Sequence, residues 1–199
     1  MKFIGHLDMV RYFQKVMRRA DVDIAYSEGF SPHQKMSFAA PLSVGITSRG
    51  EYFDIEVHST ESSEVMLEKL NKQNVEGVEI LSYRQLPEDA KNAMSIVAGA
   101  DYFVYFEKLT KEIVENFYNQ SSIEILKKTK RSEKIVDIKP MIYELRYEDE
   151  GIFMKVAQGS AANLKPDLVM QALSGFAGIS LPEFVQYERL DMYCLKEGK

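Results

Sequence analysis

The apolar residues of this chain change between strand spacing and helix spacing in the same order twice, and this repeat constrains the fold most strongly. In the first half, residues 51–57 alternate apolar and polar side chains, and residues 60–72 show helical spacing. A strand hairpin at 141–157 and a helix at 167–176 repeat the change in the second half. We therefore predict an α+β fold with two ferredoxin-like (βαββαβ) halves and antiparallel sheets.

The predicted halves cover residues 1–86 and 93–199, and residues 87–92 form a linker between them. The first half is expected to contain a first strand at 2–5 shortened at the start, a helix from His6, strands at 23–27, 51–57 and 78–83, and a helix at 60–72. The second is expected to contain strands at 95–106, 123–126, 135–138, 141–147, 152–157 and 184–195, and helices at 110–118 and 167–176. The repeat is one of element order and not of visible sequence identity.

The composition is that of a folded protein with a core. Apolar residues make up 45% of the 199 positions, enough for one large domain or two small ones. Cys194 is the single cysteine, which excludes a disulfide framework, a thiolate zinc site and a chain-borne iron–sulfur cluster. The sequence contains neither an apolar run as long as a membrane span nor a signal-peptide core. We expect a cytoplasmic protein that uses no membrane, metal or cofactor.

The charge is distributed unevenly along the chain. The net charge is −5, yet residues 1–50 hold seven basic and four acidic side chains and are therefore at +3. The remaining residues carry −8. The first fifty residues are thus the part of the chain best suited to meet an anion.

Residues 26–47, YSEGFSPHQKMSFAAPLSVGIT, have the composition of a binding loop. Gly29 can adopt positive φ and allow a partner close to the backbone, and Pro32 stiffens the loop. His33 and Lys35 add donors, so that a phosphate is the natural ligand. The alternative is a hairpin connection whose polar residues are merely solvated.

The helix from His6 has a basic face. Arg11, Lys15, Arg18 and Arg19 fall on the side opposite a predicted buried stripe of Val10, Phe13, Met17 and Ala20, and the stretch His6–Asp8 is expected to cap the helix. Such a face is most often only solvated, but its closeness in sequence to the 26–47 loop favours binding.

The stretch GHLDMVRYFQKVMRRADVDIAYSEGFSPHQKMSFAAPLSVGITSRGEYFDIEV resembles the radical-SAM-linked proteins, a bacterial family found beside, or fused to, a cobalamin-binding-domain radical SAM enzyme. The resemblance is specific over residues 3–57, and DIKPMI and GSAANLKPDLVMQAL also look like the family. It implies a radical SAM enzyme as partner. Family members usually carry further residues before this start, so Met1 is expected to be an internal start or a truncation.

The resemblance implies site residues as well. His6, Asp8 and Arg11 match the motif H-L-D-x-x-R of the family. Its other motifs are matched by Tyr26, Ser27, Gly29, Phe30, Pro32, His33 and Ser37, then by Gly45, Glu51 and Asp54, and later by Asn163, Lys165 and Pro166.

Three classes of function remain open at this point. The first, which we favour, is a module that binds RNA or another phosphate-bearing substrate for the linked enzyme, with Tyr26 and Phe30 available for stacking. The second is a metal-free enzyme, endoribonuclease-like, that uses His6 or His33 as acid–base with Asp8 as orienter. The third is a protein–protein adaptor for the radical SAM enzyme. We expect no independent catalytic activity.

For the first class, the predicted surface brings together side chains from the helix and the loop. We expect Arg11, Lys15, Arg18, His33 and Lys35 to converge on one concave surface, with His6 and Asp8 at its rim. Ordinary surface ion pairs of Arg11 and Lys15 with nearby carboxylates, such as Asp8, are the alternative.

Overall fold

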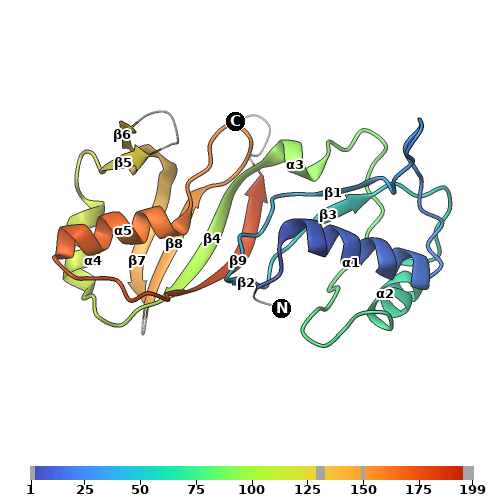
Figure 1. Cartoon of the computed structure of the whole chain (residues 1–199), viewed down its shortest axis with the longest axis horizontal. Helices are drawn as coiled ribbons and strands as arrows, with labels where there is room; N and C mark the ends of the chain where they lie inside the picture. The colour runs from blue at the N-terminus through green and yellow to red at the C-terminus, as the bar shows by residue number, and fades with distance from the viewer. Residues whose placement is uncertain (1–2, 129–132, 149–150, 195–199) are drawn as a thin grey trace. The chain divides into compact units, whose positions relative to one another are not determined.

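The computed structural model describes residues 3–128, 133–148 and 151–194 and divides the chain into two compact units (Figure 1). The first unit comprises Met1–Gly45 and Tyr52–Ser95, and the second comprises Ile46–Glu51 and Ile96–Lys199. Both contain helices and strands, which confirms the α+β class. The expected linker, residues 87–92, lies within the first unit, whereas the short segment 46–51 belongs to the second.

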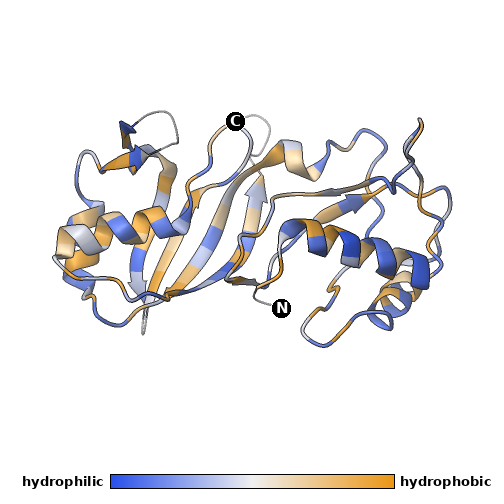
Figure 2. Ribbon diagram, viewed as in Figure 1, coloured by the Kyte–Doolittle hydropathy of each residue, from blue (hydrophilic) through white to orange (hydrophobic). Residues whose placement is uncertain are grey.

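The first unit is built on a long amphipathic helix. It contains α1 (His6–Arg19), β1 (Met36–Phe38), β3 (Phe53–Ile55) and α2 (Ser63–Asn71), and the short helix α3 (Ala93–Ile96) leads out of it. β1 and β3 form an antiparallel pair, which single bridges extend at Ile24–Val57 and Tyr26–Gln34. Figure 2 shows a polar and an apolar side along α1, as expected for a helix on the surface of a core.

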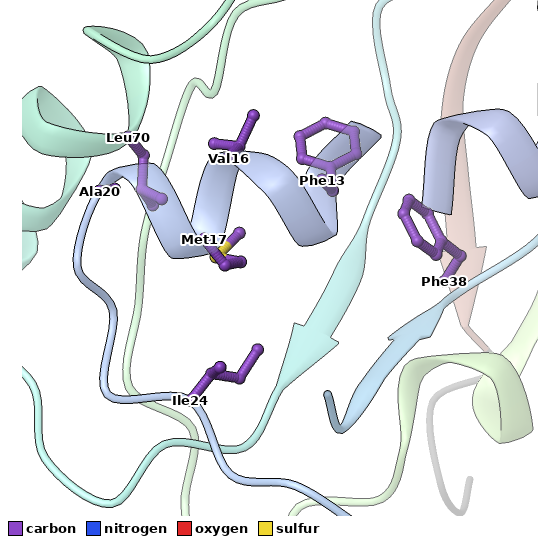
Figure 3. Close-up of a cluster of buried hydrophobic side chains, with 7 residues drawn as sticks. All are labelled: Phe13, Val16, Met17, Ala20, Ile24, Phe38 and Leu70. Atoms are coloured by element: carbon purple, nitrogen blue, oxygen red, sulfur yellow. The ribbon is translucent and has the colours of Figure 1, made fainter. Parts of the chain in front are cut away.

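The apolar side of α1 supplies most of the first core. Figure 3 shows the cluster, which consists of Phe13, Val16, Met17, Ala20, Ile24, Phe38 and Leu70. The ring of Phe13 lies 5.9 Å from that of Phe38 and 4.8 Å from that of Phe53, measured between centroids. The predicted stripe is largely correct, although Val10 is only half-buried and Val16, which the prediction omits, is fully buried.

Four local predictions for the first unit are wrong. The stretch His6–Asp8 does not cap α1, because the N-cap is Gly5 and makes no side-chain hydrogen bond. The predicted strand at 23–27 forms only isolated bridges, and the described residues 3–5 form no strand.

The predicted strand at 78–83 is also absent, and a side chain explains why. The Asn71 side-chain amide donates to the carbonyl of Ile80 at 2.8 Å and accepts from the Ile80 N–H at 2.8 Å. One asparagine thus satisfies both backbone groups of Ile80, which a neighbouring strand would otherwise have to pair. The segment still packs on the core through Val78, Ile80 and Tyr83.

The second unit is a five-stranded sheet with two main helices. Its elements are β2 (Ile46–Ser48), β4 (Val97–Tyr105), α4 (Lys111–Tyr118), β5 (Glu124–Lys128), β6 (Glu133–Asp137), η1 (Lys139–Met141), β7 (Ile142–Glu148), β8 (Gly151–Ala157), α5 (Pro166–Ala177) and β9 (Gln186–Cys194). The strand order is β2-β9-β4-β8-β7, and β5 and β6 form a separate hairpin. The core lies between this sheet and the helices, where Ile152, Met154 and Val156 are completely buried.

The order of elements from β4 to β9 follows the predicted pattern. Without the β5–β6 hairpin it reads strand, helix, strand, strand, helix, strand, and the neighbours in β9-β4-β8-β7 are all antiparallel. The sheet as a whole is mixed, because β2 pairs with β9 in parallel. The expectation of purely antiparallel sheets is therefore wrong at β2. The described part of the first unit has only the β1–β3 pair, so two ferredoxin-like halves remain a prediction.

Candidate nucleic-acid interface

Residues 27–33 form a narrow loop that closes on itself. The Ser27 N–H donates to the His33 carbonyl at 2.8 Å, and the His33 N–H donates to the Ser27 hydroxyl at 3.1 Å. The same hydroxyl lies 2.8 Å from His33 Nδ1. Gly29 has a φ of +107°, a conformation that residues with a Cβ adopt at a cost. The loop therefore has a defined shape set by its own backbone and by one serine–histidine pair.

The closed loop carries aromatic side chains in solvent. Phe30, at its tip, is fully exposed, and Tyr26, where the loop leaves the protein, is 48% exposed. The Tyr26 hydroxyl accepts a hydrogen bond of 3.4 Å from Gln34 Nε2. Pro32 is exposed beside His33. These rings are accessible to a ligand that stacks.

The basic face of α1 is only partly available. Arg11 forms an ion pair of 3.3 Å with Asp8, as the alternative of ordinary surface pairs predicts. Lys15, Arg18 and Arg19 are exposed. Arg18 and Arg19 lie in the last helical turn, where they also favour the helix by opposing its dipole. Lys15, Arg18 and Arg19 are therefore more available to a phosphate than Arg11, which already pairs with a carboxylate.

Lys35 and Ser37, further along the 26–47 segment, have partners within the first unit. Lys35 pairs with Glu56 at 2.8 Å, which joins the chain before β1 to the chain after β3. The Ser37 hydroxyl donates to Asn92 Oδ1 at 3.1 Å. The neighbouring Asp54 accepts from the Ala93 N–H at 2.7 Å. These contacts give Lys35, Ser37 and Asp54 structural roles that account for them without a ligand.

The candidate acid–base residues lie in ordinary environments. The His6 ring makes an edge-on contact with Phe38 at 5.4 Å between centroids, Asp8 pairs with Arg11, and His33 is bonded to Ser27. Within the described residues, no group of three or more His, Cys, Asp or Glu side chains could hold a metal ion. Of these three residues, His33 alone lies within hydrogen-bond distance of a hydroxyl group, that of Ser27.

The remaining predicted site residues belong to the second unit. Asn163 and Lys165 are both exposed, and Lys165 is the N-cap of α5, directly before Pro166. Their role as ligand residues rests on the family resemblance alone.

Sequence reasoning missed a buried polar cluster in the second unit. Arg189 on β9 is 1% exposed, and its Nε lies 3.5 Å from Glu51 Oε1. The Glu51 carboxylate also accepts from the Ser48 hydroxyl at 2.6 Å, and the Arg189 guanidinium lies 5.7 Å from the centroid of the Tyr102 ring. The Tyr102 hydroxyl donates to Gln158 Oε1 at 3.0 Å. Glu51 matches a family motif, but its partners Arg189 and Tyr102 are far from it in the chain, so the sequence did not bring them together.

Burial dominates the electrostatics of the cluster. It raises the pKa of Glu51, although Arg189 and Ser48 act in the opposite direction. Burial likewise raises the pKa of Tyr102. Arg189 is buried, whereas the Glu51 side chain is 33% exposed, so the pair joins segment 46–51 to β9 with only one partner fully buried.

Comparison with solved structures finds a chain of the complex titled "Crystal Structure of a Cbf5-Nop10-Gar1 Complex", with a TM-score of 0.49 and 8% identity. The similarity covers 95% of this chain and 45% of that chain, so this chain spans less than half the length of that one. No curated protein matches the sequence. None of the helices in the described ranges has the length and apolar character needed to cross a membrane.

A family model described as "Uncharacterized protein conserved in bacteria (DUF2344)" matches residues 1–166. That match includes all of the first unit and the second unit up to the first residue of α5. With most of its length covered, the chain belongs to this family of bacterial proteins, DUF2344.

Proposed function

We propose that this protein binds RNA, or another phosphate-bearing substrate, through the 27–33 loop and the exposed cations of α1, as an accessory protein of a radical SAM enzyme. The observation that carries the proposal is Phe30. It is a fully exposed aromatic ring on a loop whose shape is held by hydrogen bonds between Ser27 and His33. The radical SAM partner comes from the sequence resemblance.

A nucleic-acid base that stacks on the Phe30 ring would account for the exposure of that ring. Phe30 buries no surface in the folded protein, so it contributes almost nothing to the core. A base stacked on such a ring gains roughly 1–3 kcal/mol, and stacking tolerates any base. Because the loop is already closed, little ordering is needed when a ligand binds.

The cations of α1 would supply the salt-dependent part of binding. Lys15, Arg18 and Arg19 are exposed and lie in the same unit as the loop. Each phosphate contact to a single strand adds about 0.7 to the dependence of log affinity on log salt. Since Arg11 and Lys35 have carboxylate partners, the contribution expected from them is smaller.

A labelled single-stranded RNA, titrated at several salt concentrations, tests the proposal. Phe30→Ala should weaken binding about tenfold without changing the salt slope, since it removes stacking only. Arg18→Ala should weaken binding and lower the slope by about 0.7. Lys108→Ala, an exposed cation of the second unit, is the charge-matched control and should change neither. Absence of RNA binding at low salt would contradict the proposal.

An adaptor function is the second candidate, because an exposed phenylalanine also fits a pocket on a protein partner. Co-purification with the radical SAM enzyme that is insensitive to salt, and that Phe30→Ala abolishes, would favour it. Under that outcome Arg18→Ala should have no effect.

For the architecture, we propose that the second unit is ferredoxin-like and that the first is a reduced relative of it. The strand order β9-β4-β8-β7 and its antiparallel pairing support the first part of this proposal. An experimental structure of the chain would test the second part, because a reduced relative should keep α1 and α2 packed on the β1–β3 pair.

A further inference from the structure

Within the described residues, the helices α4 and α5 of the second unit lie on one face of its sheet and none of its helices lies on the other (Figure 1). Side chains alternate along a strand, and Ile152, Met154 and Val156 of β8 are completely buried on the side of α4 and α5. Phe153 and Lys155 therefore point to the opposite side. We call that side the open face.

Aromatic rings cover much of the open face. The Phe103 ring lies over Gly151, where an added Cβ would come within 2.7 Å of it, and the Tyr143 ring lies over Gly99 at 3.4 Å from such a Cβ. Phe103 also contacts Tyr105, with 4.9 Å between ring centroids. Tyr105 and Tyr143 remain 41% and 49% exposed. Large rings lying on glycine backbone make a flat, partly apolar surface that solvent reaches.

The cations of the open face already illustrate one mode of recognition. The Arg146 guanidinium lies 3.6 Å from the centroid of the Phe153 ring and pairs with Glu144 and Glu148. Here a cation lies over an aromatic ring and has carboxylates beside it. Cations are bound well by this combination.

The same pattern occurs across β8, β4 and β9. Lys155 Nζ lies 4.4 Å from the centroid of the Tyr193 ring and 3.7 Å from Asp101 Oδ1. At the β2 side of the sheet, Arg49 pairs with Glu188 at 2.9 Å, and Glu188 accepts from the Tyr105 hydroxyl at 3.1 Å.

Carboxylates outnumber cations on the open face. Among the described residues, Arg49, Arg146 and Lys155 are matched by Asp101, Glu144, Glu148 and Glu188, and Asp191 lies on the same side next to Asp101. A phosphate backbone would meet no excess of positive charge there. This face is therefore chemically distinct from the exposed cations of α1.

We infer that the open face docks an arginine- or lysine-rich segment of a protein partner. The partner's cations would lie over the exposed Tyr105 and Tyr143 rings, beside Glu188 and Glu144, as Arg146 and Lys155 lie over their own rings. This inference is independent of the RNA surface proposed for the first unit.

A fluorescent peptide of alternating arginine and glycine, titrated into the full chain, tests the inference. Tyr105→Ala should weaken peptide binding about threefold or more, whereas Tyr105→Phe, which keeps the ring, should retain most of the affinity. The double variant Glu144→Gln/Glu148→Gln should also weaken it. Glu112→Gln/Glu115→Gln on α4 is the control, because it removes the same charge from the helix side of the sheet. Its peptide affinity should stay within about twofold of wild type, a change no larger than a typical exposed ion pair produces.

Several results would overturn the inference. The first is an equal loss of peptide affinity in Glu112→Gln/Glu115→Gln, which would make net charge the cause. The second is unchanged peptide binding in Tyr105→Ala. The third is loss of RNA binding in Tyr105→Ala. The glutamine variants keep the test decisive if Tyr105→Ala does not fold. RNA binding in all four variants should match wild type, so failure here is distinguishable from failure of the RNA proposal.

Discussion

At the scale of single residues, the 27–33 loop contains a glycine, Gly29, in a backbone conformation that other residues adopt at a cost. It also contains an aromatic side chain, Phe30, that does not pack in the core. Gly29 has a φ of +107° with no atom within 4 Å of the place a Cβ would take, so backbone preference alone selects glycine there. Phe30 follows it directly and is fully exposed. A loop held in this way by Ser27 and His33 is consistent with a role outside the fold.

Gly29→Ala should destabilise the protein by about 1 kcal/mol, because the left-handed conformation is costly for alanine while no clash occurs. Gly175→Ala is the matched control. It also has open space, but it lies inside α5, so alanine should stabilise it by roughly 0.5–1 kcal/mol. Urea denaturation measures both. Equal changes of the same sign would show that φ at Gly29 is not the cause.

Residue-level prediction from the sequence worked where one side chain determines the outcome. A glycine at position 29 can adopt positive φ, and Gly29 has a φ of +107°. Arg11, Lys35 and Ser37 were interpreted as ligand residues, whereas the structure gives each a protein partner. The partners Glu56 and Asn92 are distant in sequence, so spacing alone could not identify them.

At the scale of elements, β2 is held on the sheet of the second unit by a set of specific contacts. The Arg49 N–H donates to the Arg189 carbonyl at 2.9 Å, and the Arg189 guanidinium pairs with Glu51 at 3.5 Å. Gly50 is required here, because a Cβ would lie 2.5 Å from the Leu190 carbonyl oxygen. A parallel strand pair between residues some 140 positions apart leaves no local signal, which is why the sequence did not predict it.

Arg189→Met should cost about 1–3 kcal/mol, because it leaves the Glu51 carboxylate, whose side chain is 33% exposed, without its cation. Arg49→Met is the control on the same strand pair. Its side chain is 70% exposed and its pair with Glu188 should contribute less than about 1 kcal/mol. Chemical denaturation of the two variants checks the difference. Similar losses would mean that the buried pair does not hold β2.

Glu51 should give the protein a distinctive pH dependence. Burial raises its pKa, so the folded state binds its proton more tightly than the unfolded state does. The resulting stability is fully present below the unfolded pKa, near 4.5, and is lost as pH rises through the folded pKa. As pH rises from 4 to 7, wild type should therefore lose stability relative to Glu51→Gln. Urea denaturation of both proteins at each pH measures this difference. A relative gain would show that attraction to Arg189 exceeds the effect of burial.

At the scale of the whole molecule, two units present surfaces of opposite character. The first carries exposed cations on α1 and an exposed aromatic loop, and the second carries a sheet face with more carboxylates than cations. The contrast is local and is not one of net charge, because the first unit holds ten basic and thirteen acidic residues and the second holds fifteen and seventeen. The exchange of segment 46–51 into the second unit could not be predicted, because it depends on pairing and burial that form only in the folded chain.

Photo-cross-linking of the full chain to a thiouridine-containing RNA, with the linked peptides identified by mass spectrometry, tests the central claim most directly. The account predicts cross-links in the segment that contains Tyr26 and Phe30, and their loss in Phe30→Ala, a variant that should keep wild-type stability because the ring is fully exposed. Cross-links confined to the second unit, or unchanged in Phe30→Ala, would contradict it.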